Sequence, residues 1–194
     1  MAVVIRPPSA AELPALRTIE RLAGERFRGV GLPEVADDEP PSLDVLTGYT
    51  DQGRCWVAID DVGGPIGYVL VDAVDGNAHV EQVSVHPDHQ GSGVGRALME
   101  RVYEWAGEAG MPAVTLTTFS DLPWNAPLYR HLGFRVLRDQ EVGPGLRAVR
   151  DQETAHGLDP SRRVCMLRAL PADEEPVPRA ATTDRRDHTP PTPA

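Results

Sequence analysis

The chain has 194 residues with a formal net charge of −10 at pH 7, and its 19 Lys and Arg positions are all arginine. Without lysine, three kinds of chemistry are excluded: Schiff-base catalysis, pyridoxal phosphate catalysis, and the Gly-Lys-Ser/Thr loop that holds nucleoside triphosphates. The arginines are scattered rather than clustered. Because a phosphate backbone would repel so negative a chain, nucleic acid is not an expected partner.

The composition is that of a soluble globular protein, with 41% hydrophobic and 25% charged residues. The length suits one domain. No apolar run approaches the roughly 20 residues of a membrane span, and the first residues lack the basic start and apolar stretch of a signal peptide. We therefore expect a cytoplasmic protein with no membrane partner.

Residues 1–170 are predicted to form a single domain, and residues 171–194 a disordered tail. The tail is rich in proline and charge, and Val177 is its only large apolar residue, so it buries too little surface to offset its chain entropy. Cys55 and Cys165 lie far apart and lack the Cys-x-x-Cys spacing of redox or zinc sites. Both are expected to be buried thiols.

The N-terminal part is predicted to contain a short strand and two helices. Residues 2–6 form the strand, and Ser9 and Glu12 have the spacing of a capping box. The helix that they begin runs to about Phe27, with apolar residues near helical spacing at Leu13, Leu16, Ile19 and Leu22. After an acidic connection that contains proline, Ser42 caps a second helix that ends near Tyr49.

The middle of the chain is predicted to be an antiparallel meander followed by a helix. Its strands are residues 54–59, 66–74 and 78–85, and the Asp75-Gly76 pair supplies the positive φ angles of a tight turn. The helix ends at Gly110, and its apolar stripe is Val94, Leu98, Val102, Trp105 and Ala109. Further along, the pattern predicts strands at 113–118, 134–137 and 163–170 and helices at 125–132 and 146–156.

The strongest local signal is a glycine-rich loop, residues 86–95, between a predicted strand and a predicted helix. Glycines allow tight turns and close approach of backbone amides to a ligand. At a helix N-terminus, these amides and the helix dipole favour a phosphate or pyrophosphate without any lysine. A dinucleotide-binding loop would instead follow the first strand of a parallel βαβ unit. The alternative role of the glycines is a tight turn with no ligand.

Two motifs resemble those of the GCN5-related N-acetyltransferase (GNAT) superfamily. Residues 90–95, Q-G-S-G-V-G, are similar to its acyl-CoA signature, and residues 129–134, Y-R-H-L-G-F, to its second marker. The order of the predicted elements agrees with the family from about residue 3 to residue 170. The resemblance implies an α+β fold with a central, twisted, mixed and mostly antiparallel sheet of about seven strands flanked by helices.

The family resemblance also implies acetyl-CoA as the co-substrate, with no metal. The strand residues Val83, Ser84 and Val85 would pair with the pantetheine arm, and a backbone amide there would polarise the thioester carbonyl. The pyrophosphate would lie on the amides of Gln90, Gly91, Ser92, Gly93, Val94, Gly95 and Arg96. His86 and His89 have a spacing possible for metal ligands, but no further ligand group accompanies them, so we expect a solvated loop.

Three residues are candidates for the catalytic proton transfers. An amine must lose a proton before it attacks, and Glu81 and His79 occupy the strand positions where several family members keep the base. The two residues are expected to share one strand face. Tyr129 matches the family tyrosine that protonates the leaving thiolate. The alternatives are a solvated Glu81 with a water relay as base, and Tyr129 as a packed aromatic.

One departure from the family pattern concerns the pantetheine contact. Family members often have asparagine seven residues before the tyrosine, but this chain has Leu122 there. Asn125 is a candidate substitute for that contact, and capping of the following helix is its alternative role. Trp124, beside two prolines, is a candidate for the lip of the acceptor pocket.

The leading functional hypothesis is acetyl transfer from acetyl-CoA to a primary amine of a small, cationic molecule in a ternary complex. The acceptor charge is suggested by Glu34, Asp37, Asp38 and Glu39, which would border the acceptor groove, although a solvated loop explains them equally well. The alternatives are acetylation of protein N-termini, as for ribosomal proteins, and a sensor that binds acyl-CoA without turnover. A homodimer is possible because dimers are common in the family.

Overall fold

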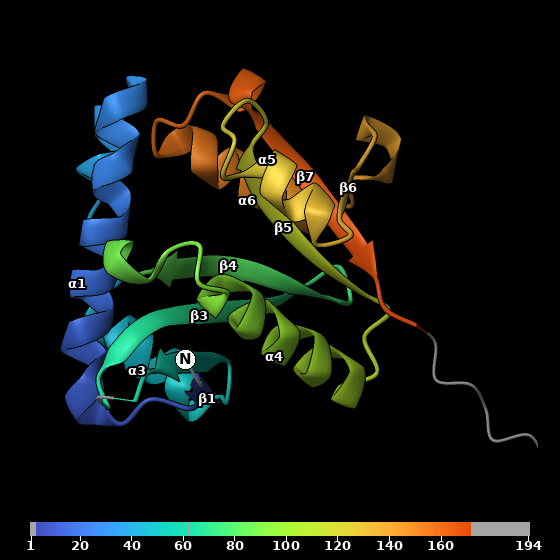
Figure 1. The fold of residues 1–194 in the computed structure, drawn as a ribbon. Helices are drawn as coiled ribbons and strands as arrows, with labels where there is room; N and C mark the ends of the chain where they lie inside the picture. The colour runs from blue at the N-terminus through green and yellow to red at the C-terminus, as the bar shows by residue number, and fades with distance from the viewer. Residues whose placement is uncertain (1–2, 62, 172–194) are drawn as a thin grey trace, which may run out of the picture.

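Within the residues that the computed structural model describes, 3–61 and 63–171, seven strands form one mixed sheet (Figure 1). The strand order is β1-β2-β3-β4-β5-β7-β6, and only β4 and β5 run parallel as neighbours. The predicted fold class is confirmed. The strands are β1 (Val4–Arg6), β2 (Cys55–Ile59), β3 (Pro65–Val74), β4 (Asn77–Val85), β5 (Ala113–Phe119), β6 (Arg135–Val136) and β7 (Arg163–Ala169).

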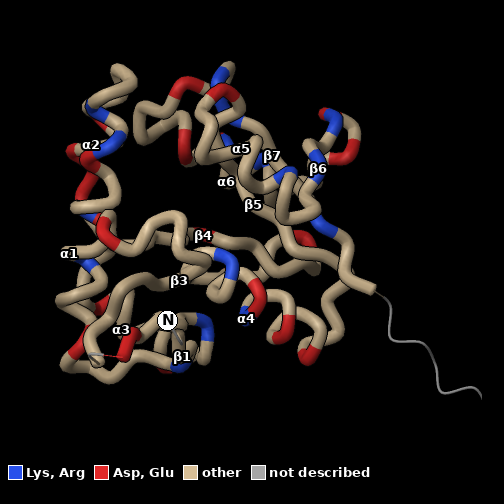
Figure 2. The backbone as a smooth tube through the Cα atoms, in the orientation of Figure 1, with Lys and Arg blue, Asp and Glu red and all other residues tan. Residues whose placement is uncertain are grey.

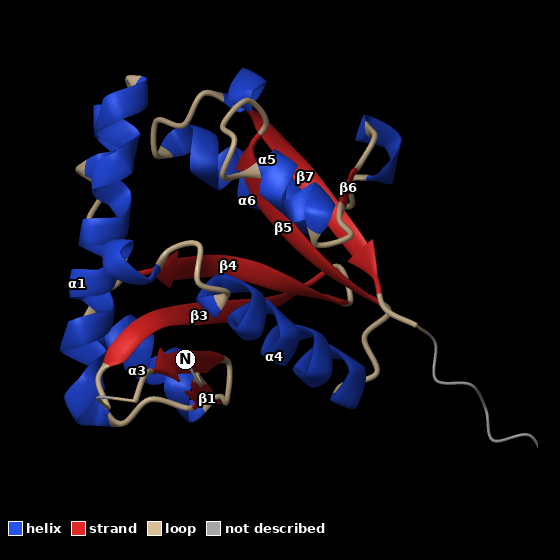
Figure 3. Cartoon of the chain, in the orientation of Figure 1, coloured by secondary structure: helices blue, strands red, loops and turns tan. Residues whose placement is uncertain are grey.

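Helices cover both faces of this sheet (Figure 3). On one face, α4 and α5 share a core with Val69, Val80 and Leu116. On the other face, α1 and α3 pack against Tyr68 and Leu70, and α6 packs on β7. The helices are α1 (Leu13–Gly24), α2 (Pro33–Ala36), α3 (Leu43–Asp51), α4 (Val94–Glu108), α5 (Ala126–His131) and α6 (Pro144–Ala155), with short 3-10 turns η1 (Ala10–Glu12), η2 (Glu25–Val30), η3 (Pro87–His89), η4 (Asp139–Glu141) and η5 (Pro160–Arg162).

The predicted start of the first helix is confirmed, with one change in how the cap is made. The Glu12 carboxylate accepts hydrogen bonds from the Ser9 amide at 2.7 Å and the Ser9 hydroxyl at 2.8 Å. Arg6 also binds Glu12, chiefly through hydrogen bonds that lower the pKa of that carboxyl to about 2. The helical stretch continues through η2 to Val30, slightly beyond the predicted end.

Three positions in the predicted apolar stripes lie differently from the expectation, and one of them, Ala109, is exposed just beyond the end of α4. Leu22 is 39% exposed on the outer side of α1. On α4, Trp105 is half-buried beside Trp56, while Met99 and Ala106 join the fully buried residues. Since α4 lies obliquely across the sheet (Figure 1), its buried face follows that crossing rather than one straight stripe.

The predicted tight turn at Asp75-Gly76 is confirmed and has a second role. Both residues have positive φ, 51° and 77°. The Asp75 carboxylate accepts hydrogen bonds from the amides of Gly145 at 2.8 Å and Leu146 at 3.0 Å. The turn therefore satisfies two amides in the first turn of α6, which otherwise lack acceptors, and fixes α6 to the β3–β4 hairpin.

Cys55 and Cys165 are free and buried, as predicted. The disordered tail predicted at residues 171–194 lies, apart from Pro171, outside the described residues. No helix in the described part of the chain is both long and apolar enough to span a membrane.

Candidate functional site

The sheet opens at its centre, where β4 and β5 diverge (Figure 1). These strands pair only between residues 78–80 and 114–116. β4 continues to Val85 with β3 as its partner, and β5 continues to Phe119 with β7. Residues 81–85 therefore present a backbone edge to the gap that no described strand occupies. Val83, Ser84 and Val85, the predicted partners of an extended ligand arm, all lie on this edge.

The glycine-rich loop follows β4 directly and leads into α4. Gly91 and Gly93 have φ of 76° and 94°, a region that favours glycine. The first hydrogen bond at this helix end runs from the Ala97 amide to the Gly93 carbonyl at 3.0 Å. Among the described residues, no acceptor binds the amides of residues 91–96. They form a row of free donors at the positive end of a helix dipole, which is an anion site.

Glu81 lies at a β-bulge where the gap begins. The β3–β4 register passes from the pair Leu70 and Gln82 to the pair Val71 and Val80, so Glu81 has no partner on β3. Bulges re-aim side chains and are frequent near active sites. The Glu81 side chain is exposed and forms no hydrogen bond or ion pair within the described chain.

The surroundings of Glu81 raise the pKa of its carboxyl. The largest effect on this pKa is desolvation by the protein packed around the side chain, although solvent still reaches part of it. The negative charges of Asp72, Glu153 and Glu20 raise the pKa further. Asp72 is held by Arg54 at 3.0 Å, and Glu153 by Arg163. Glu20 is bound by the Tyr68 hydroxyl and by the Gln82 side chain at 2.5 Å, and is in no ion pair among the described residues. These partners place Glu81 on the sheet face that α1 and α6 cover.

His79 is on the same face but is fully enclosed, with 1% of its surface exposed. Its Nδ1 is 3.0 Å from the Thr115 hydroxyl of β5. Burial is the main reason that the pKa of His79 falls to about 4, so the ring is neutral near pH 7. In this arrangement His79 has no direct route to a ligand in the gap, and Glu81 is the better placed of the two candidate bases.

Tyr129 lies on α5, which covers the face opposite Glu81. Its ring packs edge-on against Phe134, 5.7 Å away between centroids, and borders the core beneath α4. Burial raises the pKa of Tyr129 to about 12, so the hydroxyl keeps its proton at neutral pH. The candidate acid and the candidate base thus approach the gap from opposite faces of the sheet.

Comparisons with known proteins agree with this arrangement. Residues 51–136 match the family model described as an acetyltransferase (GNAT) domain. This match identifies residues 51–136 as a GNAT domain. The matched range contains the meander, the loop, the bulge at Glu81 and Tyr129, which are the parts that form the gap.

The individual relatives of this chain are distant. It is 26% identical over 99 residues to the peptidyl-lysine N-acetyltransferase YjaB of Escherichia coli (strain K12), covering 51% of this chain and 61% of YjaB. The match thus spans less than two thirds of that curated relative. The fold resembles a GNAT family acetyltransferase from Staphylococcus aureus Mu50 with TM-score 0.66, 16% identity and coverage of 88% of this chain and 100% of the other. It also resembles the PaiA N-acetyltransferase of Thermoplasma acidophilum in complex with coenzyme A, with TM-score 0.57, 14% identity and coverage of 88% and 100%.

Asn125 occupies the N-cap position of α5, as its alternative role required, but its side chain forms no capping hydrogen bond. Its Nδ2 donates to the Thr118 hydroxyl of β5 at 2.7 Å. Its Oδ1 is buried without a hydrogen-bond partner, and an acceptor of this kind can receive an amide N–H from a ligand. Leu122, at the family's asparagine position, is buried beside Phe119 and Leu32.

Arg26 forms a bridge at one end of the gap that no pattern in the sequence indicates. The Arg26 guanidinium lies 3.9 Å from the centroid of the Trp124 ring and donates to Gln90 Oε1 at 3.2 Å. Gln90 in turn donates to the Val85 carbonyl at 3.1 Å. Residues from η2, the loop before α5 and the glycine-rich loop are therefore joined here. Trp124 contributes to this bridge, and its position at an acceptor pocket stays a prediction.

The acidic connection between α1 and α3 is partly neutralised within the protein. Asp37 binds Arg28, and Glu39 lies 3.2 Å from Arg17 and 3.7 Å from Arg21. Figure 2 shows acidic and basic residues interleaved along α1 and α2. The carboxylates that act on Glu81 at the edge of the gap are instead Glu20, Asp72 and Glu153, which come from α1, β3 and α6. No group of three or more His, Cys, Asp or Glu in residues 3–61 and 63–171 is arranged to hold a metal.

Proposed function

We propose that this chain transfers the acetyl group of acetyl-CoA to the primary amine of a small, cationic molecule while both substrates are bound. The observation that carries this proposal is the unpaired Glu81 carboxylate at the point where β4 leaves β5. It lies on the strand whose free edge and following loop suit an acyl-CoA. A carboxylate held without a cationic partner among other carboxylates is a feature of functional sites.

The cofactor side of the proposal rests on the loop and the strand edge. The free amides of residues 91–96 would bind the pyrophosphate, and the edge at residues 83–85 would pair with the pantetheine arm as an added strand. The buried, unpartnered Oδ1 of Asn125 would accept an amide N–H of that arm. An amide on β4 would stabilise the negative charge that develops on the thioester oxygen. The likeness to a structure that contains coenzyme A supports this assignment.

The proton transfers follow from the two ionisable groups. Glu81 would accept a proton from the attacking ammonium, directly or through one water, and its raised pKa brings it closer to the working pH of a general base. Tyr129 would return a proton to the leaving thiolate, since its hydroxyl stays protonated at neutral pH. His79 would act as a positioning residue, because its ring is enclosed and bound to Thr115.

The acceptor side suits a cation. Glu20 and Glu81 are in no ion pair within the described residues, and Asp72 and Glu153 add negative charge beside them. A positively charged amine would be attracted to this face, and its approach would lower the repulsion among the carboxylates. A lysine side chain on a peptide is the second candidate acceptor, because it is also a primary amine with positive charge and YjaB is named as a peptidyl-lysine N-acetyltransferase.

The test is to follow thiol release from acetyl-CoA with a panel of acceptors. We would use polyamines, aminoglycosides, amino acids and lysine-containing peptides, with neutral alcohols of matched size as controls. Turnover with a cationic small amine supports the proposal, and turnover with lysine peptides alone selects the second candidate. If acetyl-CoA raises the melting temperature but no acceptor releases thiol, the chain is a binding module and the enzymatic proposal fails.

A further inference from the structure

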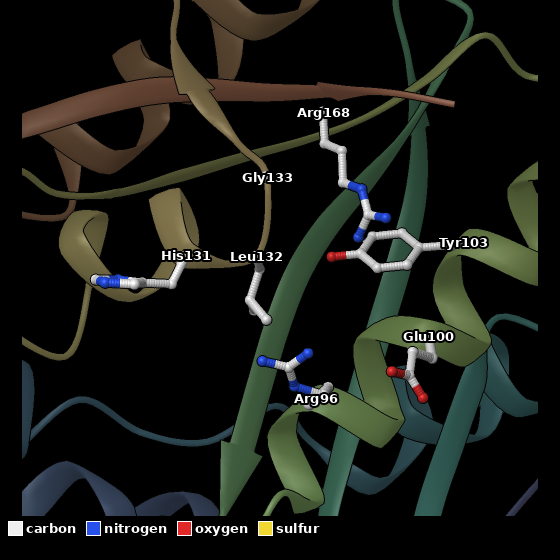
Figure 4. A pocket seen from close by; sticks show the side chains of 7 residues that line it. All are labelled: Arg96, Glu100, Tyr103, His131, Leu132, Gly133 and Arg168. Carbon is white, nitrogen blue, oxygen red and sulfur yellow. The ribbon is translucent and has the colours of Figure 1, made fainter. Parts of the chain in front are cut away.

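A cavity of about 340 Å³ lies beside α4, on the face of the sheet where the cofactor is proposed to bind. Figure 4 shows its lining, with Arg96, Glu100 and Tyr103 on α4 and Arg168 on β7 above them. Leu132 and Gly133, just after α5, form the opposite wall. Arg96 belongs to the first turn of α4, so the cavity continues directly from the row of free amides at that helix end.

The two arginines of this cavity have no anionic partner. Arg96 and Arg168 form no ion pair with any residue in the described ranges, whereas most arginines of the domain are paired, and the one hydrogen-bond contact of Arg168 is with the Tyr103 hydroxyl. Arg168 is held in place by stacking, since its guanidinium lies 3.9 Å from the centroid of the Tyr103 ring. Both arginines lower the pKa of Tyr103, against the larger effect of burial, which raises it. Their charges therefore act on the same small region.

The Tyr103 hydroxyl is the second sign that this cavity takes a ligand. It is buried, and among the described residues its one hydrogen-bond contact is with the Arg168 guanidinium. A guanidinium can only donate, so the proton of this hydroxyl has no acceptor, and a buried donor of this kind is usually explained by a missing ligand or water. Because Arg168 covers the ring and Arg96 is nearby, an oxygen-rich anion between them would also receive a hydrogen bond from Tyr103.

We propose that Arg168, Arg96 and the Tyr103 hydroxyl form a binding subsite for a phosphate monoester. Guanidinium groups match phosphate oxygens with two parallel hydrogen bonds, and a stacked guanidinium keeps this geometry. In acetyl-CoA the matching group is the 3′-phosphate of the ADP portion, which lies close to the pyrophosphate assigned to the adjoining amides. The assignment to the 3′-phosphate rests on the proposed function. The ability of the subsite to bind a phosphate monoester is independent of that function.

The other polar groups of the cavity are compatible with this ligand. Glu100 is exposed on the rim and forms no ion pair with Arg96 in the described part of the chain. His131 points away from the cavity (Figure 4), and its Nδ1 donates to the Pro127 carbonyl at 2.7 Å. The anion would therefore meet two arginines and a hydroxyl, with the one carboxylate kept at the edge.

The experiment compares the affinities of CoA and 3′-dephospho-CoA for the full chain by titration calorimetry. We expect CoA to bind at least about tenfold more tightly, because charged hydrogen bonds to the 3′-phosphate are lost in the analogue. Arg168→Gln should remove this difference and leave the affinity for dephospho-CoA unchanged. The matched control is Arg130→Gln, which removes an exposed arginine of α5 outside the cavity and should preserve the difference.

Tyr103→Phe keeps the ring under Arg168 and tests the hydroxyl separately. We expect a higher melting temperature without ligand, since a buried donor that has no acceptor is removed, together with a smaller preference for CoA over dephospho-CoA. Equal affinities of the wild type for the two cofactors would overturn the assignment to the 3′-phosphate. So would a preference that survives in Arg168→Gln.

Inorganic phosphate distinguishes a cofactor subsite from a site for another phosphate ligand. If the cofactors bind equally but phosphate stabilises the wild type and not Arg168→Gln, the subsite serves a different phosphate monoester, and the cofactor assignment is wrong. None of these measurements depends on turnover. The inference and the proposed acetyl transfer therefore fail independently.

Discussion

The two faces of the sheet at the β4–β5 gap carry opposite unpaired charges. On the α4 face, Arg96 and Arg168 and a row of helix amides have no anion among the described residues. On the α6 face, Glu20 and Glu81 are in no ion pair within that part of the chain, although Arg17 and Arg163 act on them from a distance. Because the same strand, β4, borders both faces, a polyanionic cofactor and a cationic amine would each meet complementary charge while their reacting atoms meet in the gap.

The largest effect that would test this contrast is expected from Glu81→Gln. Without the carboxylate no side chain accepts the amine proton, so kcat should fall about a hundredfold or more, while the affinity for acetyl-CoA on the other face stays the same. Thiol release and calorimetry measure the two quantities. Glu104→Gln, on the exposed side of α4, is the matched control and should retain full activity.

The pH dependence of the activity should also show that Glu81 acts as the base. A base must be deprotonated to act, so activity should fall as pH decreases through the raised pKa of Glu81, and this acidic limb should lie above the usual range of glutamate. In Glu81→Gln the limb should be absent. An identical limb in wild type and variant would show that another group is the base.

A smaller effect on rate is expected from Tyr129→Phe. A thiolate is a good leaving group, so loss of the proton donor should lower kcat by about tenfold with little change in acetyl-CoA affinity. The packing against Phe134 is kept because the ring remains. An unchanged rate would assign Tyr129 to packing alone.

The cofactor face is tested alone by Gly93→Ala. Alanine at φ of 94° costs about 1–3 kcal/mol of strain, and relief of that strain would move the amides that point at the anion. We expect acetyl-CoA to bind about tenfold more weakly, with kcat at saturation nearly unchanged. Gly95→Ala is the control, because a Cβ there meets only Val85 at an ordinary 3.7 Å. Equal losses in both variants would contradict this reading of the loop.

The smallest effect concerns stability outside the gap. Asp75→Ala removes the carboxylate that binds two amides of α6, and should lower the free energy of unfolding by about 1 kcal/mol. Chemical denaturation measures this change. Asp44→Ala, in the first turn of α3, is a control with no such hydrogen bonds in the described chain. Because α6 carries Glu153, KM for the acceptor should rise more than KM for acetyl-CoA.

The local parts of the fold were predictable from sequence, because they depend on neighbouring residues. Ser42 accepts a hydrogen bond from Val45 as a helix cap, and the Asp75-Gly76 turn joins β3 and β4. The two motifs also located the loop and Tyr129. In each case the signal and the structure that it specifies lie within a few residues of one another.

The site itself was only partly predictable. Glu81 and His79 were both expected as candidate bases on one strand face, but the bulge exposes Glu81 while Thr115 and its surroundings enclose His79. The acidic residues of the site were expected at positions 34–39. The carboxylates that act on Glu81 include instead Glu20 of α1 and Glu153 of α6, which only the packing of these helices on the sheet brings close. Arg168 was not identified, because its contact with Tyr103 joins β7 and α4, and spacing in the sequence does not report that meeting.

The bridge of Arg26, Trp124 and Gln90 has a consequence for engineering. Exchanging the segment between α1 and α3 is an obvious way to redirect a GNAT protein to a new acceptor. In this chain the exchange would also remove Arg26, and with it one of the contacts that hold Gln90 at the head of the glycine-rich loop. A chimera that keeps Arg26 would be the better starting point, because the acceptor specificity could then be changed without weakening the binding of the acyl donor.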